Sequence, residues 1–263
     1  REASSSGREF VVAGNIHNMD DLEETELPNP DDPRFYEPIE LAIRATKNTR
    51  LGVYTGINAC WEIRHCMKPA DFLMSFYRDP RFLEKLTSVY SDFYARVVAN
   101  LSHMNIDFIF ITEDIAYYSG PFVHPDLLRR FIFPRYRMVM ENSNLPFAFH
   151  SDGNILPILD DLIDLGFYAI HPVEPLAMDI AKVKEQYGNR ICLIGNIDLR
   201  YTLPRGSPRE VSEEVRTRIR QAASGGGYVV SSAKSIPEYV PTANFLAMGD
   251  TAKKCGKYSR EYF

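Results

Sequence analysis

The chain has 263 residues, of which 45% are hydrophobic and 25% are charged, with a formal net charge of -5 and a pI near 5.7. This length suits one α/β domain with a large core. The acidic composition has no cluster of basic residues that would indicate nucleic-acid binding. No apolar run approaches the roughly 20 residues that span a bilayer, and no signal-peptide pattern occurs. We therefore expect a cytoplasmic protein, acting on a small molecule or a partner protein and not on nucleic acid or membrane.

The amino-terminal part is polar. Residues 1–9 are small and polar, which predicts a flexible segment before a single domain at 10–263. Residues 10–35 are rich in Asp, Glu, Asn and Pro and are typical of a surface excursion, and residues 37–48 predict the first helix. The cysteines are few and have no CxxC spacing, so we expect thiols and not disulfides; they are Cys60, Cys66, Cys192 and Cys255.

Six short apolar runs follow, and helical patterns separate most of them. The runs predict strands at 50–57, 107–112, 146–151, 168–173, 192–197 and 228–233. The intervening helical patterns lie at 80–101, 154–166, 176–188 and 207–224. This alternation predicts parallel strands buried on both faces. Because a closed (β/α)8 barrel needs eight strands, the expected fold is an α/β TIM barrel that lacks its first two strands in this chain.

Polar side chains gather where these runs end, which in a barrel is the mouth that holds the active site. The run PFAFH ends in His150, and Asp152 lies two residues further on, so both side chains project from one face of an extended strand. We expect His150 and Asp152 to be catalytic. They could bind a metal through nitrogen and oxygen, or His150 could act as a general acid oriented by a carboxylate.

Other residues at the strand ends have weaker signals. Of Glu113 and Asp114, one should face the mouth, and we choose Glu113 as catalytic. Lys234 ends a buried run, so its charge should pair with Asp152 or anchor a substrate carboxylate. Further candidates for substrate binding, each with packing, loop capping or a rigid turn as the alternative, are Trp61, Tyr117, Tyr118, His171, Glu174, Asn196 and Asp198.

Several segments also carry a family resemblance. The stretches GNILPILDDLIDLGFYAIHPVEP, RICLIGNIDLRYTLPRGSPREV and GGGYVVSSAKSIPEYVP resemble, in order and spacing, the uroporphyrinogen decarboxylase superfamily. The resemblance runs from about residue 10 to residue 250 and implies the (β/α)8 barrel. It also implies one of two chemistries, which are decarboxylation of uroporphyrinogen without a cofactor and methyl transfer that involves corrinoid proteins.

The superfamily's thiol-activating methyltransferases bind zinc through a His-x-Cys pair and a distant Cys. The His of that motif matches His150, but Asp152 stands in place of the first Cys and Lys234 in place of the distant one. The resemblance therefore implies zinc at His150 and Asp152 only through nitrogen and oxygen ligands, and it argues against activation of a thiol.

These observations favour an enzyme that moves a methyl group from an O-methyl compound, such as a methoxylated aromatic in an O-demethylation, or from an N-methyl compound to a corrinoid protein. No DxHxxG motif occurs, so cobalamin would come from a separate partner. The runner-up is a uroporphyrinogen decarboxylase-like lyase, and a degenerate ligand-binding barrel is the alternative without catalysis. The oligomeric state is open, with a homodimer as one option.

Overall fold

The structure is a computed structural model, and it describes all residues except 1, 4–8, 11–13 and 259–263. The predicted flexible segment 1–9 lies mostly outside the described residues. Two short strands among the first ten residues pair antiparallel with each other, β1 (Glu2–Ala3) and β2 (Glu9–Phe10). The chain forms two compact units, the first made of Arg1–Asp114 with Phe122–Phe147 and the second of Ile115–Pro121 with Ala148–Phe263.

The first unit combines two strands of a parallel sheet with several helices. Its strands are β3 (Tyr54–Ile57) and β4 (Phe108–Thr112), which pair in parallel. Its helices are α1 (Met19–Glu23), α2 (Glu37–Thr46), α3 (Pro69–Arg78), α4 (Pro80–Leu101), α5 (Pro125–Leu127) and α6 (Phe133–Met140), with shorter turns at Pro33–Phe35, Glu62–Cys66 and Leu128–Ile132.

The long helix α4 shows how the sequence specifies this unit. Asp79 caps its first turn by accepting a hydrogen bond from the amide of Phe82, and Pro80 occupies the first helical position, where no amide donor is needed. Residues spaced by three and four, including Leu83 and Leu86, form its buried face. Polar residues cover the opposite face, so the amphipathic pattern fixes the side that packs inward.

The second unit holds the remaining strands of the sheet. They are β7 (Phe147–His150), β8 (Phe167–His171), β9 (Cys192–Ile197) and β10 (Tyr228–Ser232), and β5 (Ala116–Tyr117) pairs with β6 (Gly120–Pro121) in a separate hairpin. The helices are α7 (Leu159–Leu165), α8 (Ile180–Tyr187), α9 (Thr202–Arg205), α10 (Pro208–Ala222) and α11 (Thr242–Cys255), with a short turn at Leu156–Ile158.

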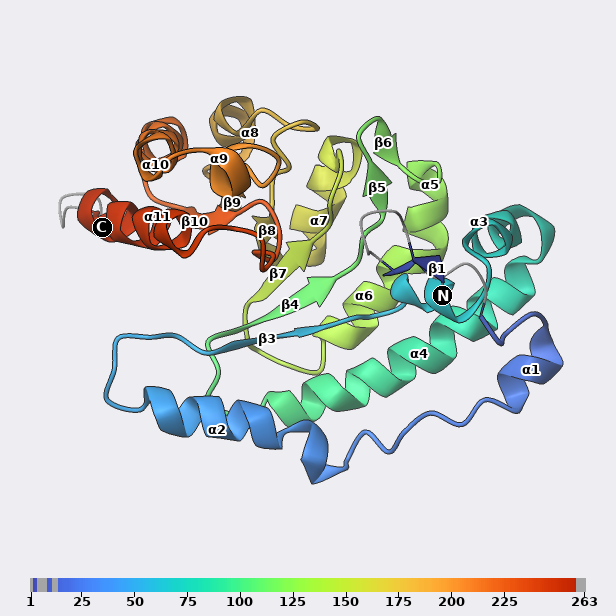
Figure 1. Cartoon of the computed structure of the whole chain (residues 1–263). Coiled ribbons are helices and arrows are strands. Elements are labelled where there is room, and N and C mark those ends of the chain that lie inside the picture. The colour runs from blue at the N-terminus through green and yellow to red at the C-terminus, as the bar shows by residue number, and fades with distance from the viewer. Residues whose placement is uncertain (1, 4–8, 11–13, 259–263) are drawn as a thin grey trace. The chain divides into compact units, whose positions relative to one another are not determined.

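Local sequence signals mark the ends of two helices in this unit. A reciprocal capping box between Ser207 and Glu210 begins α10. Gly166 ends α7 with a φ of 101°, a conformation that glycine adopts without strain. Helices α10 and α11 pack against each other (Figure 1). Beneath them lies a fully apolar cluster of Ile197, Leu203, Val211, Val215 and Val240.

The strand order of the sheet is β10-β9-β8-β7-β4-β3. All six strands predicted from the sequence are therefore confirmed, and β8, β9 and β10 pair in parallel, as β3 and β4 do. Among the described residues this sheet has six strands, so the structure agrees with the α/β class and with part of a (β/α)8 barrel.

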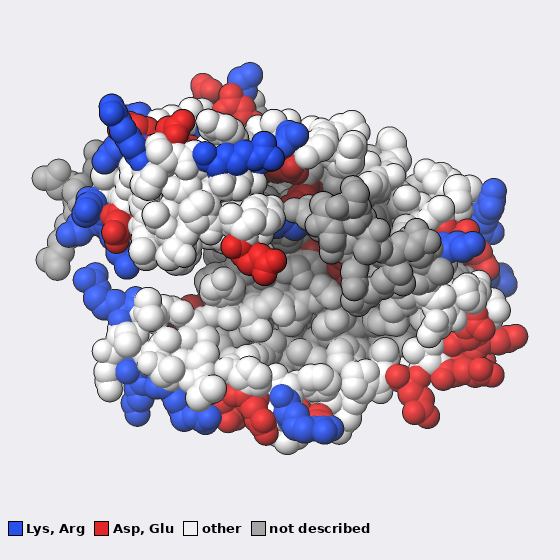
Figure 2. Space-filling model, in the orientation of Figure 1, with Lys and Arg blue, Asp and Glu red and all other residues white. Residues whose placement is uncertain are grey.

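Charges of both signs are interspersed on the molecular face drawn in Figure 2, with white surface between them. On that face the described residues form no continuous basic area, in keeping with the acidic composition. Across the part of the chain that is described, none of the helices is long and apolar enough to cross a bilayer.

The apolar cluster under α10 and α11 should contribute strongly to the stability of the second unit. Leu203 is fully buried there, so Leu203→Ala should lower the free energy of unfolding by about 2–5 kcal/mol through lost burial and a residual cavity. Urea unfolding measures this loss. Leu246→Ala on α11 is the matched control, because that side chain is 54% exposed and its removal should change little. Equal effects of the two variants would contradict the assignment of this core.

Candidate functional site

The site is built around the end of β7. Phe147, Ala148 and Phe149 are buried, and His150 is the first side chain of the strand that is only half-buried. The amide of Ser151 donates a hydrogen bond to the carbonyl oxygen of His171 at 3.1 Å, which holds the carboxyl ends of β7 and β8 side by side. Strand pairing therefore brings together two histidines that are 21 residues apart in the chain.

The two histidines contact each other through their rings. Nδ1 of His150 lies 2.7 Å from Nδ1 of His171, and the ring centroids are 4.9 Å apart. Nε2 of His171 lies 3.3 Å from the carbonyl oxygen of Ser232 at the end of β10. Burial, followed by the neighbouring His150, lowers the pKa of His171 from its ordinary 6.5 to about 4. His171 is therefore neutral at physiological pH.

Asp152 follows in the turn after β7. The ammonium of Lys234 donates a hydrogen bond to its carboxylate, with the Lys234 and Asp152 side chains 50% and 29% exposed. One of the two roles expected for Lys234, pairing with Asp152, is thus present. The next residue, Gly153, has a φ of 84°, and its amide donates to the Glu174 carboxylate at 2.7 Å. A Cβ at this position would meet the backbone of Ala116 at 2.6 Å, so the turn requires glycine.

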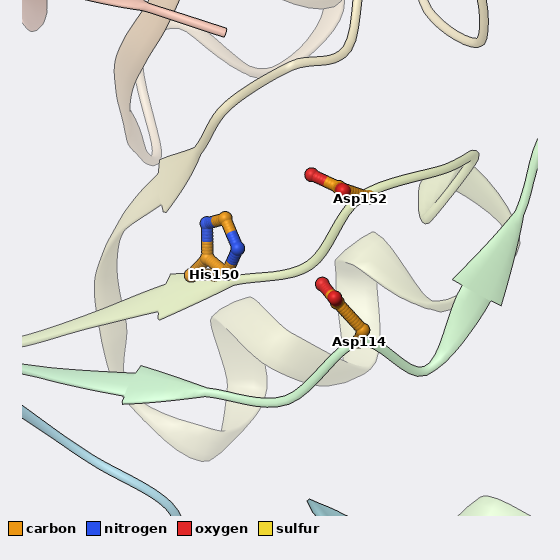
Figure 3. Close-up of side chains that lie close together, drawn as sticks. All are labelled: Asp114, His150 and Asp152. Atoms are coloured by element: carbon orange, nitrogen blue, oxygen red, sulfur yellow. The ribbon is translucent and has the colours of Figure 1, made fainter. Parts of the chain in front are cut away.

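Asp114 is the third residue of a group that could bind a metal ion, beside His150 and Asp152 (Figure 3). It is joined directly to Ile115, whose amide donates to Ser151 Oγ at 3.1 Å in the second unit. One ligand atom from each of Asp114, His150 and Asp152 lies within 4.8 Å of the others. One imidazole nitrogen and two carboxylates form a donor set that zinc and other divalent cations accept, so these residues fit such an ion.

Glu113, chosen over Asp114 from the sequence, lies in the interior of the first unit. Glu113 is 0% exposed, and its carboxylate accepts hydrogen bonds from the amides of Ala59, Cys60 and Trp61 and from the hydroxyl of Tyr136. It fastens the loop after β3 to the end of β4 and does not face an open site. Burial raises the pKa of Glu113 from 4.5 to about 8, with the amide of Ala59 acting in the opposite direction.

Three residues expected to bind substrate instead have structural partners. Trp61 is fully buried, stacks edge-on against Phe72 and donates its indole N–H to the carbonyl oxygen of Asp114, in keeping with packing, the alternative given for it from the sequence. Asp198 accepts hydrogen bonds from the amides at 200–202 and so caps the loop that leads into α9. Asn196 is 1% exposed and donates to the carbonyl of Val173 at 2.7 Å. Asn196 also lines a pocket next to Pro175 and Arg218, and its Oδ1 has no hydrogen-bond partner among the described residues.

Tyr117 and Tyr118, in contrast, are exposed. They lie on the β5–β6 hairpin with 58% and 43% of their surface accessible and ring centroids 5.0 Å apart. Desolvation, followed by the charge of Glu174, raises the pKa of Tyr118. The described part of the second unit therefore presents an aromatic pair beside Glu174, and Glu174 also holds the turn that carries Asp152.

Asp114 was the functional candidate that the sequence reasoning passed over. In β4 the odd-numbered residues 109 and 111 are fully buried and the even-numbered ones are partly exposed. Continued past the strand, this alternation places Glu113 on the buried face and Asp114 on the other. This alternation cannot be seen in the sequence, because every residue from Phe108 to Ile111 is apolar.

The model of the family "Uroporphyrinogen decarboxylase (URO-D)" matches residues 5–255, and the chain belongs to this family. The chain is similar to two proteins named "Methylcobamide:CoM methyltransferase MtaA", from Methanosarcina barkeri and from its strain Fusaro / DSM 804. The identities are 29% and 27% over 142 residues, which is 54% of this chain and 40% of each relative. The matched region thus spans about two fifths of the length of these relatives.

A solved structure agrees with the fold. A methyltransferase from Methanosarcina mazei superposes with a TM-score of 0.75 at 21% identity, over 90% of this chain and 69% of the other. This likeness supports the α/β barrel architecture of the family, to which the six-stranded sheet corresponds.

The burial of Glu113 should make stability depend on pH. Because its folded pKa is raised above the unfolded value, its contribution to stability is complete below about pH 4.5 and is lost as the pH rises through about 8. Urea unfolding should therefore show the protein losing stability between pH 5 and pH 8.5. Glu113→Gln should remove that part of the pH dependence. It should also lower the free energy of unfolding by about 1–3 kcal/mol, because the new side-chain amide nitrogen would face the backbone N–H donors of residues 59–61. An identical pH dependence in both proteins would exclude this role.

Proposed function

We propose that the protein is a methyltransferase that takes a methyl group from an O-methyl or N-methyl compound and passes it to the Co(I) corrinoid of a separate protein. Membership of the URO-D family and similarity to methyltransferases that act on a methylcobamide support this proposal. The observation that carries it is the group Asp114, His150 and Asp152, in which an imidazole and two carboxylates converge.

This group suits the difficult part of the reaction. As the bond from the methyl carbon to oxygen or nitrogen breaks, its electron pair stays on the leaving atom, and the methyl carbon bonds to cobalt. An uncompensated anion in a protein interior is costly, so the leaving atom needs a proton or a Lewis acid. His150 can supply a proton from its ring, and the flanking carboxylates would stabilise the imidazolium that donates it.

A divalent cation would provide the Lewis acid in the other route. Asp114, His150 and Asp152 would hold it, and when bound it would polarise the leaving atom. Zinc is the ion that we propose, because imidazole and carboxylate are among its usual ligands. Lys234, which is half exposed, would then leave Asp152 and interact with the substrate.

The ligand types favour the methyl-donor side of such chemistry over the thiol side. Activation of a thiol suits a thiolate-rich zinc site, whereas here Asp152 and Lys234 occupy the positions where the resemblance places cysteines. The relatives are named for coenzyme M, a methyl acceptor, so this chain would differ from them in the compound that reacts with the corrinoid.

A methoxylated aromatic acid is the donor that we propose. Tyr117 and Tyr118 offer an exposed aromatic surface in the same unit as His150, and offset or edge-to-face stacking on tyrosine suits an aromatic ring. Lys234 offers a cation for the carboxylate. The runner-up reaction is the decarboxylation for which the family is named, and the assay below distinguishes the two.

Replacement of His150 tests the reaction. When the protein, a methoxyaromatic donor and a Co(I) corrinoid protein are mixed, the absorption spectrum should change to that of methyl-cobalt. His150→Ala should slow this change at least ~100-fold, within the range for a lost general acid. His103→Ala is the matched control, because His103 is exposed just beyond the end of α4. If no donor in a broad panel gave methyl-cobalt while a porphyrinogen released CO₂, decarboxylation would replace methyl transfer.

Replacement of Lys234 tests whether the methyl donor carries a carboxylate. Lys234→Met keeps most of the apolar stem but removes the charge, so the KM for carboxylated methoxyaromatics should rise about 10-fold or more, while neutral analogues change little. Lys182→Met, at an exposed position of α8, serves as the control. Equal losses for charged and neutral donors would show that Lys234 does not select the carboxylate.

A further inference from the structure

The hydrogen bonds that link Ser232, His171 and His150 fix where each ring carries its proton. The carbonyl oxygen of Ser232 can only accept a hydrogen bond, and it lies 3.3 Å from Nε2 of His171. A hydrogen on Nε2 of His171 satisfies this contact, which is shorter than the 3.5 Å contact of the same nitrogen with the Ser231 hydroxyl. A neutral imidazole has one N–H, so Nδ1 of His171 is left as an acceptor.

That acceptor is the atom that faces His150. The two Nδ1 atoms are 2.7 Å apart, a distance at which one nitrogen must donate and the other accept. With His171 accepting, the proton between the rings belongs to His150 Nδ1. The reverse assignment would set a lone pair of His171 Nε2 against the carbonyl oxygen of Ser232, which is repulsive.

We propose that His171 is a positioning residue that holds a proton on Nδ1 of His150 and so confines the reactions of His150 to Nε2. Neutral His150 then presents a lone pair at Nε2, which can bind a metal ion or accept a proton. Protonated His150 presents Nε2–H, while Nδ1–H still donates to His171. The hydrogen bond between the rings is the same in both states, so only Nε2 changes.

The fold supports this arrangement from three strands. The main chain of β8 is tied to the turn after β7 by the bond from Ser151 to the His171 carbonyl, and β10 supplies the Ser232 oxygen. Figure 3 shows one ring nitrogen of His150 on the side of Asp114 and Asp152. Because Nδ1 contacts His171, the nitrogen on that side is Nε2. Histidines that bind metals commonly have their second nitrogen fixed by such a hydrogen bond.

This inference rests on the proposed function only in taking His150 as the central group. Both routes proposed above, proton donation and metal binding, use Nε2 of His150. Without His171 the neutral ring could exchange its proton between the two nitrogens, and a ring with Nε2–H cannot ligate through that atom. Loss of His171 should therefore weaken metal binding without removing any ligand.

The test reads the proton position directly. In long-range ¹H–¹⁵N NMR spectra of the metal-free protein at pH 8, with His150 assigned by comparison with His150→Ala, Nδ1 of His150 should carry a proton, whether or not Nε2 is protonated as well. His171→Phe removes the acceptor and should shift His150 towards the Nε2–H form. His171→Asn, whose Oδ1 can accept where Nδ1 did, should keep the Nδ1–H form. Ser231→Ala, which loses only a contact of 3.5 Å to His171, is the matched control.

Zinc affinity provides the second readout. His171→Phe should weaken zinc binding by roughly 10–100-fold, the usual effect of losing such a hydrogen bond, and His171→Asn should restore most of the affinity. An Nε2–H form of His150 in the unmodified protein, or the same form in all variants, would overturn the inference. The NMR test needs neither donor nor corrinoid, so a protein without methyl transfer activity could still confirm the position of this proton.

Discussion

The parallel pairing of neighbouring strands is the constraint on which the rest of this structure depends. Parallel strands need connections that cross the sheet, so their carboxyl ends lie along one edge. In the second unit this edge brings together His150 from β7, His171 from β8 and the Ser232 carbonyl from β10. Because register fixes which side chain ends each strand, a slip of one residue would turn His150 or His171 to the opposite face.

The features that repeat along the chain were readable from the sequence. Six strands, the helices between them and the position of His150 follow from apolar runs that end in polar residues. The partners of individual polar side chains were not readable, because they depend on contacts between distant segments. Glu113 satisfies amides 52 to 54 residues away, and Trp61 fills a core of aromatic rings. Asp198 is a local exception, since its capping role was one of the alternatives weighed from the sequence.

The charges at the site suit two states, one in which Lys234 pairs with Asp152 and one in which a divalent ion is bound. In the structure Lys234 compensates Asp152, so the carboxylate has a partner without a bound ion. A divalent cation would bring two positive charges close to Asp114 and Asp152 and would repel the ammonium, and the long, half-exposed side chain of Lys234 can withdraw at little cost. After it leaves Asp152, the Lys234 ammonium could bind the carboxylate of a substrate. His171, neutral and held by β8 and β10, keeps its relation to His150 in both states.

The Lewis-acid route requires that this site binds a divalent ion through nitrogen and oxygen, with His150 as its imidazole ligand. X-ray absorption spectroscopy of the zinc-loaded protein tests it most directly. The first shell should contain nitrogen and oxygen at about 2.0–2.2 Å and include one imidazole, and the imidazole signal should disappear in His150→Ala. A sulfur shell near about 2.3 Å, or a zinc spectrum unchanged in His150→Ala, would contradict it.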